Sequence, residues 1–296
     1  MRRKSNMTKD KGLTLTVVCF VQSANYGEGE GNTSFLKKFT RGTGEQYTYI
    51  TRRALCYSLT KALKWDNTPV VAQGSGESQV VQYSPDATIL DYPEIDLFGY
   101  MKTEKGSNGL KRAAVVRLSD AISLEPFAGD LDLLTNMGLA ARGGFANSLA
   151  QSEEHLSLYS YTVAVDLDQV GVDGTLEVSN EEKAKRINKL LEGIEFLDRG
   201  IKARPESLMP LFVIGGVYDR KNPYFKDRVR MKKGRLLVNG LQELIQSYED
   251  LQTHTRVGLV SDWFENEEEI REKLPVRTVA EFFNELRKEV RDYYVE

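Results

Sequence analysis

The chain has 296 residues, of which 41% are hydrophobic and 28% are charged, and its formal net charge is −3. This composition is typical of a soluble globular protein with a sizeable core, built as one large domain or two modest ones. No apolar run reaches the roughly 18 residues that a membrane-spanning helix needs, and no apolar segment follows the basic N-terminus. Cys19 and Cys56 lie in apolar periodic segments, which indicates buried thiols in a reducing compartment. We therefore expect a cytoplasmic protein with no membrane partner.

The small net charge hides two segregated runs of charge. Residues 220–235 include eight basic residues and the single acid Asp227. Residues 262–272 include six acids and the single base Arg271. A basic face and an acidic face on one molecule can steer two different partners.

The first predicted element is a strand over residues 12–22, where side chains alternate cleanly between two faces. A glycine-rich stretch follows, from Asn25 to Asn32. It lacks the Lys-Ser/Thr pair of a phosphate-binding loop, and its glutamates would repel phosphate, so we expect a flexible connection. The next cations either line an anionic ligand or belong to a solvated loop; they are Lys37, Lys38 and Arg41.

A helix is predicted from Thr51 to Trp65, and Arg52 stands at the head of its apolar stripe. A cation in the first turn opposes the helix dipole. An anion at the same helix end would offset that cost, and a phosphate is the natural candidate because free N–H groups point toward it. The alternative is an arginine that reaches solvent from the helix edge. Arg53 lies on the outer side of this helix.

Residues 66–93 are irregular and interrupted by Pro and Gly, which indicates an excursion from the core. Short strands are predicted over 96–101 and 113–119, joined by a polar basic loop, so that they form a projecting hairpin. Phe127 lies just beyond it and is either tucked into a small satellite core or free to wedge between bases. Asp130 and Asp132 could hold a metal, but their spacing favours the start of a short helix.

The second half of the chain repeats the alternation of strand and helix. A strand is predicted over 155–167, and a capping box at Ser179 begins a helix that Gly200 closes. A third strand, 207–218, contains Gly215-Gly216, a pair that permits close approach by a ligand or by a neighbouring element.

The basic run follows this strand and has its cations at a spacing of two, with Phe225, Val229 and Met231 between them. A strand here would present a ladder of cations that favours a polyanion; the alternative is a solvated edge strand. The C-terminal part from Asn239 is predicted to be largely helical, with a capping box at Thr278. The candidate binding cations of the basic run are Lys226, Arg228, Arg230, Lys232 and Lys233.

The sequence gives no positive sign of enzymatic chemistry. His155 and His254 are isolated, and no zinc spacing, nucleophile elbow or nucleotide-binding loop occurs. We expect a protein without catalytic residues, metal or cofactor.

Several separated motifs resemble those of the CRISPR-associated DevR family, the backbone subunit of type I-B Cascade. They are the glycine-rich stretch 25–32, Tyr49-Ile50-Thr51-Arg52-Arg53-Ala54-Leu55, Asp96-Leu97-Phe98-Gly99-Tyr100-Met101 and Arg112-Ala113-Ala114-Val115-Val116-Arg117. The order of elements also fits the β-α-β-β-α-β plan of an RNA-recognition-motif-like (ferredoxin-like) α+β domain. We expect one such domain over residues 1–296, with an insertion at 66–150 and a mostly helical elaboration at 239–296.

The resemblance implies a function in antiviral defence. Copies would polymerise head-to-tail along CRISPR RNA with other Cascade subunits, and target DNA would pair with the exposed guide. It implies that Arg52 and its helix contact guide phosphates and that the 102–127 arm is a thumb. Related backbone proteins of another CRISPR type cut RNA with a thumb aspartate, for which Asp120, Asp130 and Asp132 would be the candidates, but the resemblance implies a family that does not cut. The implied RNA-binding residues are Asn25, Lys37, Lys38, Arg41, Thr51, Arg52, Arg53, Lys111, Arg112, Arg117, Phe127, Gly215, Gly216, and the five cations of the basic run.

Two rival functions stay open. A DNA-binding autoregulator would read base edges with a helix, but no helix-turn-helix signature occurs and the basic run is predicted to be a strand. A guide-processing endonuclease of related fold would depend on His155 or His254. The acidic 262–272 run is hypothesised to set the interface between copies or to repel nucleic acid from the outer surface.

Overall fold

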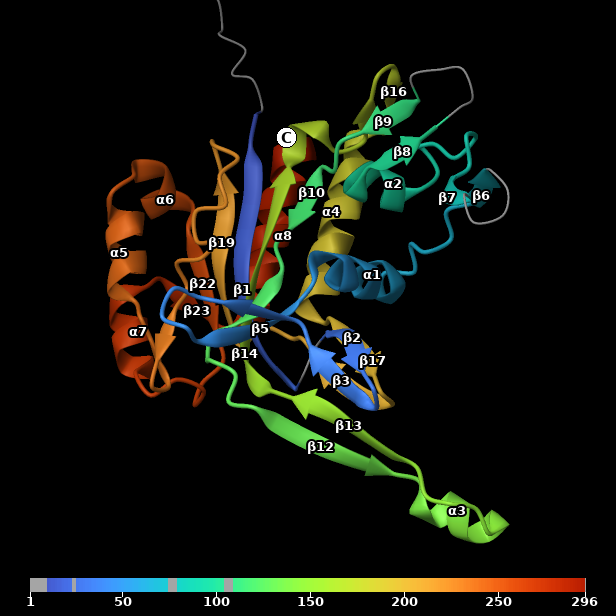
Figure 1. The fold of residues 1–296 in the computed structure, drawn as a ribbon. Helices are drawn as coiled ribbons and strands as arrows, with labels where there is room; N and C mark the ends of the chain where they lie inside the picture. The colour runs from blue at the N-terminus through green and yellow to red at the C-terminus, as the bar shows by residue number, and fades with distance from the viewer. Residues whose placement is uncertain (1–9, 23–24, 74–78, 104–108, 296) are drawn as a thin grey trace, which may run out of the picture.

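The computed structural model describes residues 10–22, 25–73, 79–103 and 109–295 (Figure 1). Its centre is a nine-stranded sheet with the order β23-β22-β19-β1-β14-β11-β5-β4, and β10 also pairs with β14. The strands are β1 (Gly12–Gln22), β4 (Lys38–Thr40), β5 (Gln46–Ile50), β10 (Val116–Leu118), β11 (Ala121–Ser123), β14 (Leu156–Asp166), β19 (Phe212–Tyr218), β22 (Arg256–Leu259) and β23 (Val276–Arg277).

Strand β1 has the predicted bounds and lies between β14 and β19, antiparallel to both. In this register Val17 is paired with Tyr161 on one side and Val213 on the other. All of β1 except its last few residues is buried, because both faces of the sheet are covered along most of its length. The predicted strand at 155–167 is also confirmed, as β14.

Three helices cover one face of the sheet: α1 (Arg52–Ala62), α4 (Asn180–Glu195) and α8 (Val279–Val295). Both predicted N-caps are present, and the one at Thr278 is a full capping box, because the Thr278 amide also donates to the Glu281 carboxylate at 2.9 Å. Ser179 Oγ accepts from the Glu182 amide at 3.3 Å, and Thr278 Oγ1 accepts from the Glu281 amide at 3.2 Å. The predicted closure of α4 at Gly200 is wrong, because α4 ends at Glu195 and Gly200 lies in β17 (Asp198–Ile201), which pairs with β18 (Arg204–Ser207).

The other face of the sheet is covered only in part. Residues 219–275 pack on the β19 and β22 side through a second core that includes Phe225, Val229 and Leu251. The segment contains β20 (Met231–Lys232), β21 (Arg235–Leu236), α5 (Asn239–Gln246), α6 (Glu249–His254) and α7 (Glu267–Lys273). The predicted cation ladder is wrong, because residues 224–228 form turns and only Met231–Lys232 within the ladder is strand. The β14 and β11 side of this face stays open.

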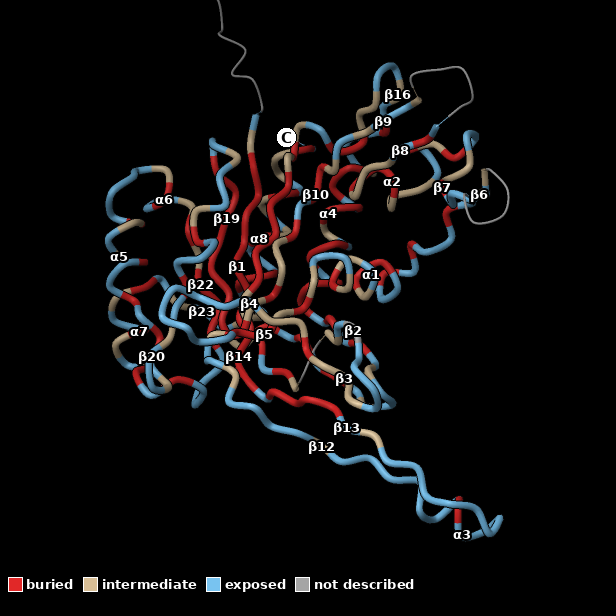
Figure 2. Tube along the Cα trace, in the orientation of Figure 1, coloured by how far each residue is buried: buried red, intermediate tan, exposed pale blue. Residues whose placement is uncertain are grey.

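A long arm leaves the sheet at the start of β14 (Figures 1 and 2). It consists of β12 (Asp130–Thr135), α3 (Met137–Gly143) and β13 (Leu149–Glu154). At the base of the arm, β13 pairs in parallel with β3 (Thr33–Leu36), which forms a hairpin with β2 (Tyr26–Glu30). Two predictions are therefore wrong: the stretch 25–32 is largely a hairpin strand, and Asp130 and Asp132 lie in a strand rather than at a helix start.

The region between α1 and β10 forms smaller units. They are the hairpin of β6 (Val70–Gln73) and β7 (Val80–Tyr83), helix α2 (Pro93–Phe98), and the hairpin of β8 (Tyr100–Lys102) and β9 (Leu110–Arg112). The predicted strand over 96–101 is wrong in its first half, because Pro93 begins a helix there and Gly99, at φ 77°, ends it. The tip of the predicted basic loop, residues 104–108, lies outside the described residues.

A short 3₁₀ turn, η2 (Leu167–Gln169), precedes the small hairpin β15 (Val172–Asp173) and β16 (Leu176–Glu177). Of the helices in the described ranges, none has the length and apolar character needed to cross a bilayer.

Candidate nucleic-acid interface

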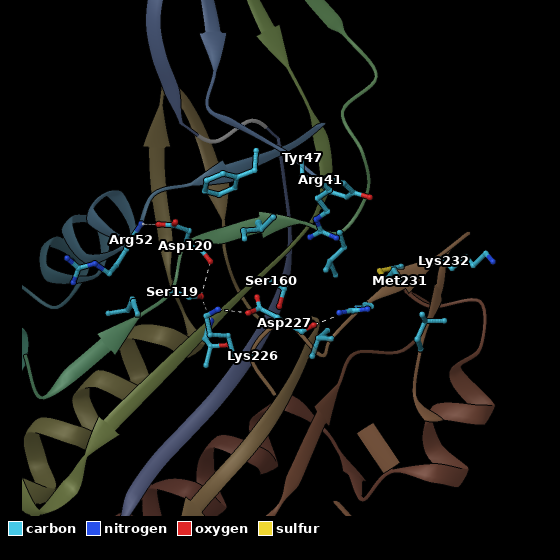
Figure 3. A pocket seen from close by; sticks show the side chains of 18 residues that line it. Arg41, Tyr47, Arg52, Ser119, Asp120, Ser160, Lys226, Asp227, Met231 and Lys232 are labelled. Atoms are coloured by element: carbon cyan, nitrogen blue, oxygen red, sulfur yellow. Dashed lines mark hydrogen bonds and ion pairs between the residues drawn. The ribbon is translucent and has the colours of Figure 1, made fainter. Parts of the chain in front are cut away.

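The open half of the sheet is the floor of a cleft of about 980 Å³ (Figure 3). Ser160 and Thr162 of β14 and Ile122 of β11 line its floor. One wall comes from the start of α1 and the β4–β5 hairpin, and the other from the segment around β20. Segments about 170 residues apart in the sequence, at Arg52 and Lys226, therefore face one space.

The cleft has an excess of positive charge. Of the described residues, no carboxylate lies within ion-pair distance of four of its cations, whereas Lys226 is paired with Asp227. Arg41 stacks on the Tyr47 ring, with 3.9 Å between its guanidinium carbon and the ring centroid. An exposed cluster of this sign favours a polyanion and makes its binding dependent on salt. The cations are Arg41, Arg52, Lys226, Arg230 and Lys232, and the acids are Asp120 and Asp227.

The N-terminus of α1 already has an anionic partner. The Asp120 carboxylate accepts a hydrogen bond from the Arg52 amide at 2.6 Å, and the Thr51 hydroxyl accepts from the Ala54 amide at 3.2 Å. The expectation of a phosphate at this helix end is therefore corrected, since a side-chain carboxylate satisfies the first N–H group. The Arg52 side chain is exposed and lines the cleft. Arg53 is exposed on a separate groove beside α1.

Two candidates near the arm have structural roles, and a third lies outside the cleft. The Asn25 amide oxygen accepts from the Thr51 amide at 3.0 Å and so fixes the start of α1. Lys38 pairs with Glu153 at 2.6 Å between side chains that are largely buried, with its ammonium 4.6 Å from the Phe127 ring centroid. Lys37 is half-buried and does not line the cleft.

Phe127 packs against the body, as in the first of its two predicted alternatives. Its ring is half-buried and lies edge-on to His155, with 5.6 Å between centroids, which favours the tucked alternative over the base wedge. The His155 ring nitrogen Nδ1 lies 2.7 Å from Thr48 Oγ1, which also lies 2.6 Å from the Tyr159 hydroxyl. Burial lowers the pKa of His155 below its usual range, so the ring is neutral at pH 7.

The cations around β9 and β10 lie outside the cleft. The Arg112 side chain is buried and donates to Asp96 at 2.6 Å, and Arg186 contacts the same carboxylate at 2.8 Å. The Arg112 guanidinium therefore belongs to an internal ion pair. Arg117 makes two bonds of 2.7 Å to the Asp166 carboxylate, and this pairing raises the pKa of Arg117. Lys111 is exposed on β9 but does not line the cleft.

Gly215 and Gly216 lie inside the buried strand β19 and are not open to a ligand. A Cβ atom at Gly215 would stand 2.2 Å from the Thr14 carbonyl oxygen, and one at Gly216 would stand 2.2 Å from the His254 carbonyl oxygen. The neighbouring chain, rather than a ligand, requires these glycines, and their placement in an RNA site is corrected.

The basic run is anchored by Phe225 and Val229, which are buried in the second core. Their burial turns Lys226, Arg230 and Lys232 toward the cleft. Arg228 and Lys233 are also exposed, but they do not line it.

Sequence reasoning missed several lining residues. Phe39 is 40% exposed and stacks on Tyr49, with 4.0 Å between ring centroids. Ser160 and Thr162 alternate with the apolar side chains of β14, and this polar alternation on a strand was the available signal for an open sheet face. Among the described residues, no group of three potential metal ligands occurs.

The comparisons that find a match all find CRISPR-associated proteins. A family model described as "CRISPR-associated negative auto-regulator DevR/Csa2" matches residues 13–233. A comparison with curated proteins finds no match. A solved chain described as "CRISPR RNA-guided surveillance complex, pre-nicking" has a TM-score of 0.61 and 10% identity, covering 94% of this chain and 100% of that chain. Another, "CRISPR RNA-guided surveillance complex", has a TM-score of 0.57 and 14% identity, covering 94% and 99%. At these identities the likeness concerns the fold.

Proposed function

The chain belongs to the CRISPR-associated DevR/Csa2 family, and on that premise we propose that it is a non-catalytic, RNA-binding subunit of a CRISPR surveillance complex. The basic cleft over the open sheet face carries the proposal. Four cations from two distant segments, with no carboxylate partner among the described residues, converge on a floor that includes Ser160. This arrangement suits a phosphate backbone and is indifferent to base sequence.

The domain is proposed to be an RNA-recognition-motif-like palm. Supporting this, β1, α1, β10 with β11, β14, α4 and β19 follow one another along the chain, and the sheet has the order β19-β1-β14 with β10 and β11 beside β14. The three helices lie on one face and the cleft on the other.

The thumb is proposed to be the 130–154 arm, not the 102–127 segment. The described residues of the 102–127 segment are held against the body, because Lys102 is buried, Arg112 is paired internally and Phe127 is tucked against His155. The arm at 130–154 projects freely from the sheet (Figure 1). Copies would assemble head-to-tail on the guide RNA of a type I-B Cascade, with other Cascade subunits and with target DNA paired to the guide. A repeating contact of this kind is heterologous and does not close into a ring.

The experiment is co-expression of the chain with a CRISPR array transcript, followed by size exclusion with measurement of mass and nucleic-acid content. We expect a large assembly that protects RNA and that disappears in an Arg52→Glu/Arg230→Glu variant. Lys189→Glu/Arg291→Glu is the matched control, because these two residues are exposed on α4 and α8, on the helix-covered face of the sheet. A monomer or dimer free of RNA would refute the proposal, as would equal loss of RNA in the control.

The family description favours one second candidate, a negative autoregulator. Such a protein would bind a promoter duplex of its own operon. Tight binding of that duplex by a chain that does not protect guide RNA would select it. Cleavage of repeat RNA that His155→Ala abolishes would select the processing endonuclease instead.

A further inference from the structure

The arm over residues 130–154 is held to the body at its base. Every residue of the arm is described, and the buried ones are Ala140 in α3 and residues 152–154 at the base of β13 (Figure 2). The ladder between β13 and β3 pairs two residues of each strand. An isolated two-stranded ribbon is marginal in water, so the direction of the arm depends on the side chains at this base.

Two consecutive glutamates at the base bond to different parts of the body. Because side chains alternate along a strand, Glu153 and Glu154 leave β13 on its two opposite faces. Residues of β3 and β4 bond to Glu153. Residues of β18, β2 and the end of β1 bond to Glu154. The arm is therefore anchored from both of its faces.

The first anchor joins Glu153 to the wall of the cleft. Both of its carboxylate oxygens lie 2.6 Å from the Lys38 ammonium, and one of them accepts from the Leu36 amide at 2.8 Å. The Lys38 ammonium also lies 4.6 Å from the ring centroid of Phe127, which shortly precedes β12. Lys38 therefore contacts both ends of the arm, while the next residue of β4, Phe39, lines the cleft.

The second anchor joins Glu154 to the body on the other face of β13. One terminal nitrogen of Arg204 lies 3.0 and 2.9 Å from its two carboxylate oxygens. The Tyr26 hydroxyl donates to the same carboxylate at 3.1 Å, and the Gln22 side-chain amide donates at 3.2 Å. Burial alone would raise the pKa of Glu154, but these donors lower it below its usual value. The carboxylate is therefore charged at neutral pH.

We propose that Lys38 and Arg204 are positioning residues that together fix the angle between the arm and the cleft. Each holds one face of β13, so the loss of both lets the arm tilt about its base. The six residues of β12 span about 20 Å, and a tilt of about 15° would move the end of β12 by about 5 Å. The consequence for RNA rests on the proposed function, because a thumb must meet the guide at the same place in every copy.

A purely stabilising role for the two anchors is the alternative. Ion pairs between partly exposed side chains contribute little to stability, and the Arg204 side chain is 32% exposed. That alternative predicts easier unfolding in urea with an unchanged direction of the arm. The direction itself is therefore the quantity to measure.

Pulsed electron paramagnetic resonance measures this direction as a distance between two spin labels. The labels are attached at Leu139→Cys in α3 and Lys189→Cys in α4, both exposed positions, in a Cys56→Ser background. Cys19 is fully buried and stays unlabelled. The native chain should give one narrow distribution of distances.

Removing both anchors should broaden that distribution. We expect Lys38→Met/Arg204→Met to widen it by about 5 Å, in keeping with the tilt above. Lys38→Arg should keep it narrow, because a guanidinium can also bond both oxygens of a carboxylate. Lys37→Met is the matched control, since Lys37 is the adjacent half-buried lysine and has no carboxylate within ion-pair distance in the described ranges. A distribution that stays narrow in the double variant would overturn the proposal.

Arg204→Met alone keeps the test decisive if the double variant does not fold. It removes a partly exposed side chain and should widen the distribution as well, with cooperative unfolding in urea retained. A narrow distribution in this folded variant would show that Arg204 does not position the arm.

An RNA measurement separates the anchors from the proposed function. With the array transcript, the double variant should lose the large RNA-protecting assembly, although its cleft cations are all present. A widened distribution with the assembly intact would overturn the role of the anchors in holding RNA. A native chain that has a narrow distribution but protects no RNA would refute the proposed function and leave the anchors standing.

Discussion

Neutralising two cleft arginines should lower both the affinity for RNA and its dependence on salt. Four cations of the cleft have no carboxylate partner among the described residues, whereas Lys226 is offset by Asp227. On a single strand each phosphate contact contributes a slope of about 0.7 in log K against log salt, so four contacts predict a slope of about 3. The Arg52→Gln/Arg230→Gln variant should reduce that slope by about 1.4. With the two affinities taken as equal at about 1 M salt, affinity should fall about 25-fold at 0.1 M salt, which is about 1.9 kcal/mol, but only about fourfold at 0.4 M.

The measurement is fluorescence anisotropy of a guide-length single-stranded RNA at four salt concentrations. Lys189→Gln/Arg291→Gln removes the same charge from exposed positions on α4 and α8, on the helix-covered face of the sheet. This control should keep the slope of the native chain. Equal slopes for the cleft variant and the native chain would show that RNA does not lie along the cleft. A parallel loss in the control would show that only total charge matters.

Three further predictions concern stability. Asp96→Ala should cost about 3–5 kcal/mol of unfolding free energy in urea denaturation, because it removes the buried carboxylate that the Arg112 and Arg186 side chains share, and leaves Glu182 at 3.0 Å as the carboxylate partner of Arg186 and Asp173 at 3.9 Å as that of Arg112; a loss below 1 kcal/mol would contradict this. Gly215→Ala should cost about 1–3 kcal/mol or more, since its Cβ would stand 2.2 Å from the Thr14 carbonyl oxygen, whereas Gly138→Ala, with open space around it, should stay within about 0.5 kcal/mol. Burial lowers the pKa of His155, so the unfolded chain binds the extra proton first and stability should fall as pH drops below about 6.5. His155→Gln should remove that part of the pH dependence, and an unchanged profile would refute it.

Much of the fold could be predicted from the sequence because it depends on local periodicity. The alternation over 12–22 predicted β1 with its observed bounds, and the capping boxes at Ser179 and Thr278 predicted where two helices begin. Each of these signals depends only on residues that are a few positions apart in the sequence. The arm was missed because Asp130 and Asp132 suit both a helix start and a strand, and only the pairing of β12 with β13 decides between them.

The sequence predicted only part of the candidate site. The sequence indicated Arg52 and the basic run as separate candidates, and both reach the cleft. It also nominated Arg112, Arg117 and the glycine pair, since residue type alone cannot tell a free cation from one paired with a carboxylate 16 or 49 residues away. Partners at such separations depend on the sheet register.

By itself, the sequence determined the family, the alternation of strands and helices and the segregation of charge, because these are properties of motifs and local patterns. Only the tertiary structure decided which cations face one space. It also decided that Asp120 occupies the helix end expected for a phosphate, and that the projecting arm is 130–154. The physical reason is that burial and ion pairing are set by which strands become neighbours, and β14 brings together residues far apart in the chain.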